Sequence, residues 1–244
     1  MTTFLFEGYV GLVLLALLVV GWRYLERRVF AALAIGATAW LAYVGVMSYF
    51  GVVGNPALRP PGAVYILLPV IALVAFVSRS VVGMRAALVV PAAVVIALQA
   101  FRIGVELLLH RLYVDGLVPK LMTYEGGNVD IVIGLSAPLI AWLSTRGRSG
   151  MQWALVWNVA GLAALANVAI RAVGTAPGAL HVIHSEVPNL AVGMFPFTYL
   201  AGLFAPLAVL GHVLAIRSLR SQFKSASASS GAAGWDRLAQ ARRP

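Results

Sequence analysis

The chain has 244 residues, of which 61% are hydrophobic and only 11% are charged, and its mean hydropathy is +0.91. Soluble domains carry about 25% charged residues and roughly 45–50% apolar ones. So few charges cannot cover the surface of a water-soluble domain, which excludes a soluble globular enzyme, a disordered chain and a fibrous chain. The composition predicts an all-α, polytopic membrane protein whose first partner is the lipid bilayer.

Cysteine and charge narrow the chemistry further. The chain has no cysteine, which excludes disulfides and thiolate metal ligands. Its net charge is +10, and most of the cations lie between apolar stretches or near the carboxy terminus. This distribution favours contact with lipid headgroups, and we expect no nucleic-acid partner.

Seven stretches are candidates for transmembrane helices, which need about 20 mostly apolar residues. They are Phe6–Tyr24, Val29–Val53, Gly62–Val77, Leu88–Tyr113, Asn128–Thr145, Met151–Val173 and Leu190–Leu214. Two forms of the fourth stretch stay open: an unbroken span, and a break at Pro91 that leaves residues 80–90 as an interfacial segment. The first stretch lacks a basic leader and a cleavage site, so we expect a retained span. Residues 1–219 are therefore predicted to form a bundle of about seven transmembrane helices, with six or eight still open.

Lysine and arginine indicate the orientation, because cytoplasmic segments are enriched in cations. With the amino terminus outside, thirteen cations are cytoplasmic: Arg23, Arg27, Arg28, Arg79, Arg85, Arg146, Arg148, Arg217, Arg220, Lys224, Arg237, Arg242 and Arg243. Four are external: Arg59, Arg111, Lys120 and Arg171. We therefore predict an external amino terminus and an odd number of spans. Residues 220–244, rich in Ser, Ala and Gly and basic, are predicted to form a flexible cytoplasmic tail.

Three polar residues of the fourth stretch, Arg102, Glu106 and His110, recur every four positions and therefore lie along one helical face. A charge near the bilayer centre costs about 2.5–3.5 kcal/mol on insertion scales. We therefore expect Arg102 and Glu106 to pair with each other and to face the bundle interior or a wet cavity. Two interpretations stay open: a salt bridge that fixes helix packing, and a buried site for a ligand or for protons.

Further polar residues are expected near that face. Glu125, in the loop after this helix, is predicted to lie near His110, and Asn128 or Asp130 is predicted to cap the next helix. Asn158 lies within the sixth stretch, where an amide bridges helices or contacts a ligand. The candidate ligand-binding residues are Arg102, Glu106, His110, Glu125, Asp130 and Asn158.

The histidines support a second hypothesis. His181 and His184 are three residues apart in the last external loop. Together with His110 and an acidic residue they would hold zinc in a metal-dependent hydrolase of a lipid or an amide.

Two cofactors are not expected. A retinal Schiff base needs a lysine inside the membrane, and Lys120 and Lys224 both lie outside the predicted spans. A membrane cytochrome needs axial histidines at matching depth, whereas His110 and His212 fall near opposite membrane surfaces. His212 is interpreted as a helix-end or interface residue.

The segments Gln99–Pro138 and Pro188–Ser218, about 30% of the chain, resemble a family of small bacterial multi-spanning membrane proteins. No activity is associated with that family, so the resemblance implies a location in the bacterial inner membrane and assigns no role to any residue.

The leading functional hypothesis is non-enzymatic and needs no cofactor. The protein would recognise or pass a small polar or anionic ligand, or protons, through an outward-facing polar cavity. Arg102 would hold an anion or tune the carboxylate, Glu106 would titrate, and His110 would relay at the mouth. The hydrolase, and a scaffold whose polar face only holds helices together, remain as alternatives. The sequence leaves the substrate and the oligomeric state open.

Overall fold

The computed structural model describes residues 1–179 and 181–241, and every regular element within those ranges is helical. The α-helices are α1 (Thr2–Tyr24), α2 (Arg27–Tyr49), α3 (Val64–Arg79), α4 (Val81–Val89), α5 (Ala92–Leu98), α6 (Phe101–Val114), α7 (Asp130–Ser144), α8 (Gly147–Gly174) and α9 (Ala205–Ala241). Short 3-10 turns occur at Lys120–Met122, Tyr124–Gly126 and Ala191–Gly193, and a π-helical turn at Leu200–Phe204 precedes α9. The all-α prediction is confirmed.

Five helical runs of the described residues are long and apolar enough to cross a membrane, rather than the seven predicted. They are Thr2–Tyr24, Arg27–Tyr49, Ala92–Val114, Gly147–Gly174 and Leu200–Ser225. A sixth arises if the bent pair α3 and α4 counts as one broken span. The remaining predicted stretch corresponds to α7, whose 15 residues are fewer than a straight span needs.

The helices break between the third and fourth stretches at Ser80, and within the fourth stretch at Pro91. Ser80 is extended and its hydroxyl accepts a hydrogen bond from the Gly83 N–H at 3.0 Å, which caps α4 and leaves it bent by 63° from α3. Val90 is also extended, because a following proline disfavours helical geometry. The break at Pro91, one of the two forms left open, is confirmed.

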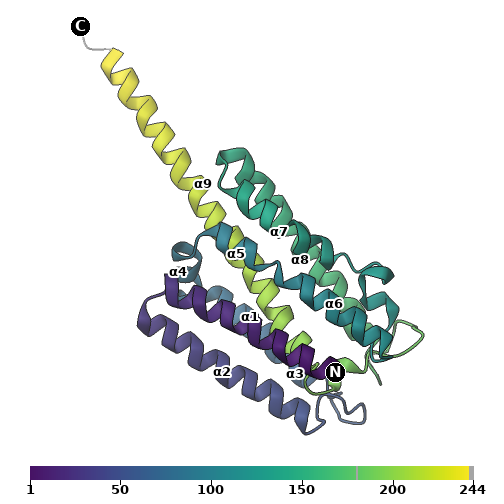
Figure 1. Cartoon of the computed structure of the whole chain (residues 1–244). Coiled ribbons are helices and arrows are strands. Elements are labelled where there is room, and N and C mark those ends of the chain that lie inside the picture. Colours follow the sequence, from purple (N-terminus) through teal and green to yellow (C-terminus); the bar gives the residue numbers. More distant parts are fainter. Residues whose placement is uncertain (180, 242–244) are drawn as a thin grey trace.

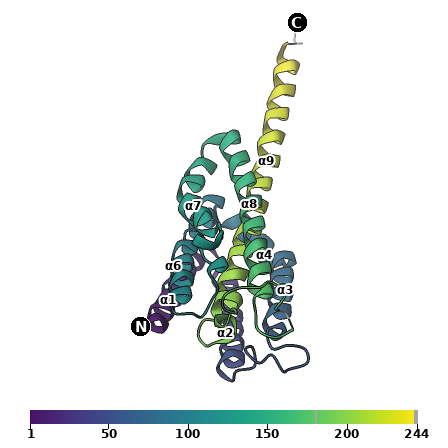
Figure 2. The same cartoon turned by 90° about the vertical axis from the view of Figure 1, so that its right-hand side faces the viewer.

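Helix α9 is the centre of the bundle. It packs against α3, α4, α5 and α8, while α7 packs against α5, α6 and α8 (Figures 1 and 2). One apolar cluster lies between α5, α7, α8 and α9 around Ile96, Ala137, Ala154 and Leu219. A second cluster, which includes Phe6, joins α1 and α6 to the start of α9. Helix α2 lies at the periphery.

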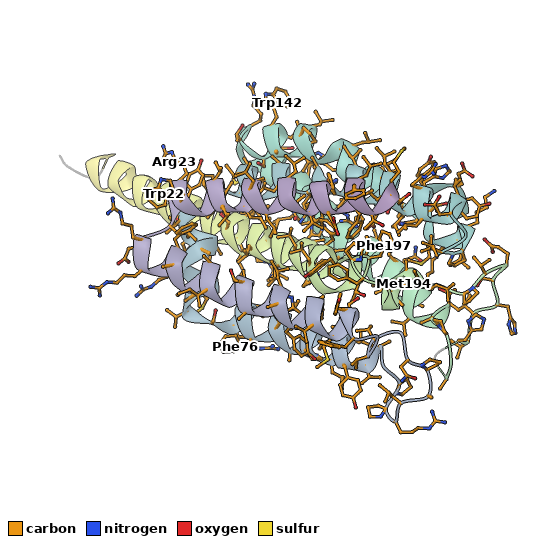
Figure 3. The ribbon with its side chains drawn as sticks, turned by 60° about the horizontal axis from the view of Figure 1, so that its bottom comes forward. Trp22, Arg23, Phe76, Trp142, Met194 and Phe197 are labelled. Carbon is orange, nitrogen blue, oxygen red and sulfur yellow. The ribbon has the colours of Figure 1, made fainter. Side chains whose placement is uncertain are left out.

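The connecting segments gather at two ends. One end of the bundle, which we call the loop end, holds the amino terminus and segments 50–63, 115–129, 175–179 and 181–199 (Figure 1). The α1–α2 turn, α4 and the α7–α8 turn lie at the other, which we call the α9 end because α9 leaves the bundle there. Figure 3 shows Trp22 and Arg23 toward the α9 end and Met194 and Phe197 toward the loop end. The segments predicted to be cytoplasmic therefore share one end.

The carboxy-terminal segment is continuous with the bundle. Helix α9 runs past Leu219, where the predicted tail begins, to Ala241. Arg242 and Arg243, two of the predicted tail cations, lie outside the described residues.

Candidate functional site

Helix α6 carries Arg102 and Glu106 into the bundle, where they are 2% and 1% exposed. They were expected to pair with each other, but the Arg102 guanidinium forms its ion pair with Asp130, the first residue of α7. Arg102 Nε also donates to Asp130 Oδ2 at 3.2 Å. The predicted Arg102–Glu106 pair is wrong because the start of a neighbouring helix supplies a carboxylate to the same guanidinium.

The opposite side of the guanidinium meets His212 of α9. Arg102 Nη1 lies 3.0 Å from His212 Nε2, and His212 Nδ1 lies 2.8 Å from Oδ1 of Asn158 on α8. Asn158 Nδ2 donates to the Ala154 carbonyl at 2.7 Å, which leaves Oδ1 to accept from the imidazole. His212 therefore carries its proton on Nδ1 and accepts from Arg102 as a neutral ring.

Glu106 has a different partner. Asn128 Nδ2 donates to Glu106 Oε1 at 2.6 Å and to the Met122 carbonyl at 3.0 Å, while Asn128 Oδ1 accepts from the Asp130 N–H at 3.1 Å. Asn128 thus satisfies one free N–H at the start of α7, but the cap position itself is Val129, so neither Asn128 nor Asp130 is the N-cap that was predicted. Within the described part of the chain, Glu106 Oε2 has no hydrogen-bond partner and Glu106 forms no ion pair.

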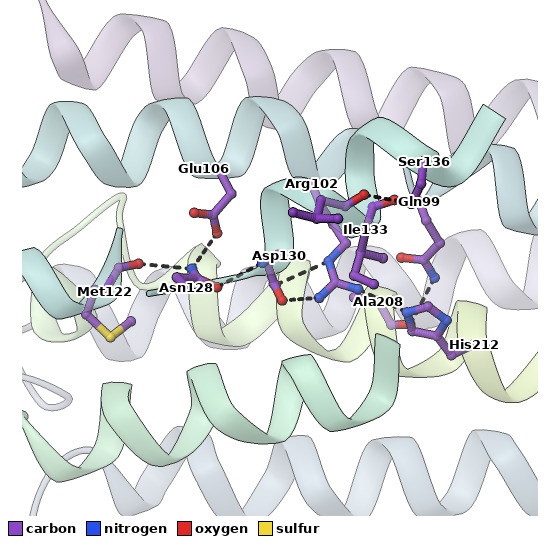
Figure 4. Close-up of polar contacts among 11 residues, drawn as sticks. Gln99, Arg102, Glu106, Met122, Asn128, Asp130, Ile133, Ser136, Ala208 and His212 are labelled. Atoms are coloured by element: carbon purple, nitrogen blue, oxygen red, sulfur yellow. Dashed lines mark hydrogen bonds and ion pairs between the residues drawn. The ribbon is translucent and has the colours of Figure 1, made fainter. Parts of the chain in front are cut away.

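These contacts join six buried residues, which we call the buried polar chain: Glu106, Asn128, Asp130, Arg102, His212 and Asn158. Figure 4 shows it extending from the α6–α7 loop at Met122 toward His212. It connects α6, α7, α8 and α9. A polar path thus extends from the α6–α7 loop into the interior of the bundle.

Two glycines allow the helices that carry the buried polar chain to pack closely. A Cβ at Gly161 of α8 would lie 2.3 Å from His212 Cε1, and one at Gly134 of α7 would lie 2.9 Å from the Ile103 backbone nitrogen of α6. Any side chain at either position would separate the helices. The small residues therefore allow the imidazole to lie against α8 and Asp130 to reach Arg102.

A further buried amide lies beside this chain. Gln99, at the break between α5 and α6, donates from Nε2 to the Ala208 carbonyl at 3.0 Å. Its Oε1 has no hydrogen-bond partner among the described residues. Gln99 therefore ties α5 to α9 and leaves one buried acceptor open.

His110 and Glu125 lie together at the loop end, as predicted. His110 Nδ1 is 3.8 Å from Glu125 Oε1, and Glu125 Oε2 is 3.8 Å from Lys120 Nζ. The His110 ring also stacks on Tyr124 at a centroid distance of 5.0 Å. His110 and Glu125 are partly exposed, and no hydrogen bond or ion pair described here joins them to Arg102 or Glu106.

The proposed metal ligands are not brought together. His181 and His184 are neighbours, with ring centroids 6.3 Å apart, but His110 is engaged with Glu125. Within residues 1–179 and 181–241, no group of three His, Cys, Asp or Glu side chains is close enough to hold a metal ion. The separation follows from the fold, because His110 is on α6 whereas the other two lie in the loop before α9.

Two pockets of the structure lie away from the buried polar chain. One, of about 150 Å³, is at the loop end, where Gly54 and Gly193 approach each other. The other, of about 330 Å³, is at the α1–α2 turn. No residue of the buried polar chain lines either pocket, so neither pocket is the predicted cavity around Arg102 and Glu106.

His212 is the functional candidate that sequence reasoning missed. The seventh span was predicted to end at Leu214, which placed His212 near a membrane surface. The apolar run is instead Leu200–Ser225, made of the π-helical turn and the first part of α9, and His212 is at its middle. Correct boundaries would have shown a histidine in the middle of an apolar run long enough to span a membrane, which is a signal of function.

The fold and the buried polar chain define the class: an all-α bundle with apolar helices long enough to cross a membrane, compatible with an integral membrane protein. The family model described as "Domain of unknown function (DUF8737)" matches residues 60–220, and the chain therefore belongs to that family. The match contains the whole buried polar chain and leaves out α1 and α2. Searches of curated proteins and of solved structures find no match.

Proposed function

We propose that this protein is an integral membrane protein that binds and passes protons, with Glu106 as the proton-binding group. The observation that carries the proposal is the isolation of the Glu106 carboxylate. It is buried, Asn128 is its one hydrogen-bond donor, and no cation among the described residues pairs with it. A buried carboxylate without a counter-ion is stabilised when it takes up a proton.

The contacts of Arg102 favour protons over a small anion. Arg102 is the one cationic side chain among the buried residues described, and Asp130 and His212 already occupy its guanidinium. An anionic ligand would have to compete with the buried Asp130 carboxylate for the same positive charge. Binding a proton at Glu106 involves no such competition.

His110 and Glu125 are suited to exchange protons between Glu106 and the outside. His110 lies one helical turn beyond Glu106 on α6, and its ring is partly exposed beside the Glu125 carboxylate. A histidine ring has two nitrogens, each of which can hold a proton, so it can accept a proton on one side and release one on the other. We therefore assign the loop end as the side from which Glu106 is loaded.

In this proposal all seven predicted segments are in the membrane, with α3 and α4 as one broken span and α7 as a short span across a locally thinned bilayer. The amino terminus is outside a bacterial cell membrane, and the α9 end faces the cytoplasm. Support comes from the arginines of the α1–α2 turn, of α4 and of the α7–α8 turn, which share the α9 end (Figure 1).

The test is proton flux into proteoliposomes that contain the purified full chain and an internal pH-sensitive dye, under an imposed pH gradient. We expect Glu106→Gln to reduce the rate to that of empty vesicles, while Glu106→Asp, which keeps a carboxylate, retains measurable flux. Glu7→Gln is the matched control, because Glu7 is an exposed acid on α1. Circular dichroism and gel filtration establish that each variant is folded.

Two results would refute the proposal. One is a wild-type rate no faster than that of empty vesicles. The other is a folded Glu106→Gln variant with the wild-type rate, which would leave the buried polar chain as a structural element only.

A further inference from the structure

The α1–α2 turn forms an open pocket of about 330 Å³ that is lined by Trp22, Leu25, Glu26, Arg27 and Phe30. Its shape depends on Gly21, because a Cβ at that position would lie 2.9 Å from Phe30 Cδ2. The Phe30 ring therefore lies over α1, and the Trp22 ring meets it edge to face at 5.8 Å and 81°.

The α1–α2 turn that forms this pocket carries unpaired positive charge, and Arg27 and Glu26 are its charged residues that line the pocket. Arg23, Arg27 and Arg28 are exposed, and none of them forms an ion pair with another described residue. Arg23 only lies over the Tyr24 ring, at 5.4 Å from its centroid. Glu26 is the single acid of the turn, so the turn has an excess of cations that an external anion can neutralise. Guanidinium groups match phosphate oxygens in geometry as well as in charge.

The surface of α1 and α2 beside the pocket is formed by exposed apolar side chains. On α1, Leu15, Leu18 and Val19 are 58%, 47% and 59% exposed, and on α2 Ile35 is 70% exposed. An acyl chain can cover this surface while a headgroup lies at the rim. The pocket therefore favours an amphiphile over a free inorganic anion.

The same end repeats the pairing of aromatic and cationic side chains. Arg146, at the α7–α8 turn, lies over the half-exposed Trp142 ring at 4.3 Å from its centroid. Tyr24 and Leu25 pack against the apolar cluster between α5, α7, α8 and α9, which anchors the α1–α2 turn to the bundle. Tryptophan and arginine gather at this depth in membrane proteins, where the phosphates of the lipid lie.

We propose that the α1–α2 pocket binds the headgroup of an anionic phospholipid, with Arg27 and Arg28 on the phosphate, the Trp22 and Phe30 rings beneath the glycerol, and an acyl chain along α1. The inference rests on the membrane placement proposed above but not on proton transfer through Glu106.

The experiment is native mass spectrometry of the detergent-purified full chain, titrated separately with phosphatidylglycerol and phosphatidylcholine. We expect preferential retention of phosphatidylglycerol, and Arg27→Gln/Arg28→Gln should weaken that retention by roughly tenfold. Arg59→Gln is the control, because Arg59 is an exposed arginine at the loop end. A Trp22→Ala variant should weaken the retention of both lipids and leave the preference for phosphatidylglycerol unchanged.

Three outcomes would overturn the proposal. The first is equal retention of the two lipids. The second is an effect of Arg59→Gln as large as that of the double variant. The third is displacement of phosphatidylglycerol by millimolar inorganic phosphate, which would indicate a site for a free anion. Glu106→Gln should bind lipid like the wild type, so failure of the proton proposal and failure of the lipid proposal give different patterns.

Discussion

A double-mutant cycle on Arg102 separates the pairing seen in the structure from the one that sequence spacing favours. Arg102→Met leaves the Asp130 carboxylate buried without its cation, and Asp130→Leu leaves the guanidinium without its anion. Breaking a buried pair by removing one partner costs about 3–5 kcal/mol. We therefore expect each single variant to lose roughly that free energy of unfolding.

The double variant should lose less than the sum of the two single variants. With both charges gone, the main remaining cost is the His212 Nε2 acceptor, which loses the Arg102 donor 3.0 Å away. An unsatisfied buried acceptor costs about 1–3 kcal/mol. The coupling free energy between Arg102 and Asp130 should then be at least about 3 kcal/mol, which is already the upper end of what contacting residues show.

The second cycle pairs Arg102→Met with Glu106→Gln. These two side chains form no ion pair among the described contacts, so we expect a coupling below about 1 kcal/mol. The assay is reversible unfolding of the full chain in mixed detergent micelles, followed by circular dichroism. A coupling to Glu106 that exceeds the coupling to Asp130 would refute the structural pairing.

Two further predictions concern packing and the loop end. Gly161→Ala places a Cβ 2.3 Å from His212 Cε1 and should lower the free energy of unfolding by about 1–3 kcal/mol. Gly8→Ala is the control, because no atom lies within 4 Å of its new Cβ, and it should change that free energy by less than about 1 kcal/mol. Equal effects of the two variants would contradict close packing of α8 and α9 at the imidazole. Arg171→Met removes two 2.8 Å hydrogen bonds to carbonyls of loop 115–129, so amide hydrogen exchange in that loop should accelerate by about tenfold or more. Unchanged exchange would show that other contacts hold the loop.

Sequence length and hydropathy were sufficient for the parts of the fold that depend on local properties. The first two spans follow from continuous apolar runs, and the break at Pro91 follows from the geometry of proline. The proximity of His110 and Glu125 was also predictable, because a short loop separates them.

The partner of Arg102 was not predictable by the same reasoning. Spacing along α6 gives the distance to Glu106 but not the position of a carboxylate 28 residues away on α7. His212 was missed because the loop before α9 is apolar enough to resemble the start of a span, which shifted the predicted helix toward the amino terminus. Both errors concern contacts between elements, which hydrophobic periodicity does not encode.

The order of residues in the buried polar chain has a consequence for biosynthesis. Arg102 leaves the ribosome 28 residues before Asp130 and 110 residues before His212. In the membrane placement proposed above, the insertion machinery would hold, until α7 follows, a helix whose guanidinium has only Glu106 one turn away as a counter-ion, and a charge at mid-helix costs about 2.5–3.5 kcal/mol to release into lipid. The α5–α6 segment should therefore remain with that machinery until Asp130 arrives. A nascent chain stopped before α7 should be a substrate for membrane quality control, while one stopped after α7 should already have neutralised its buried charge.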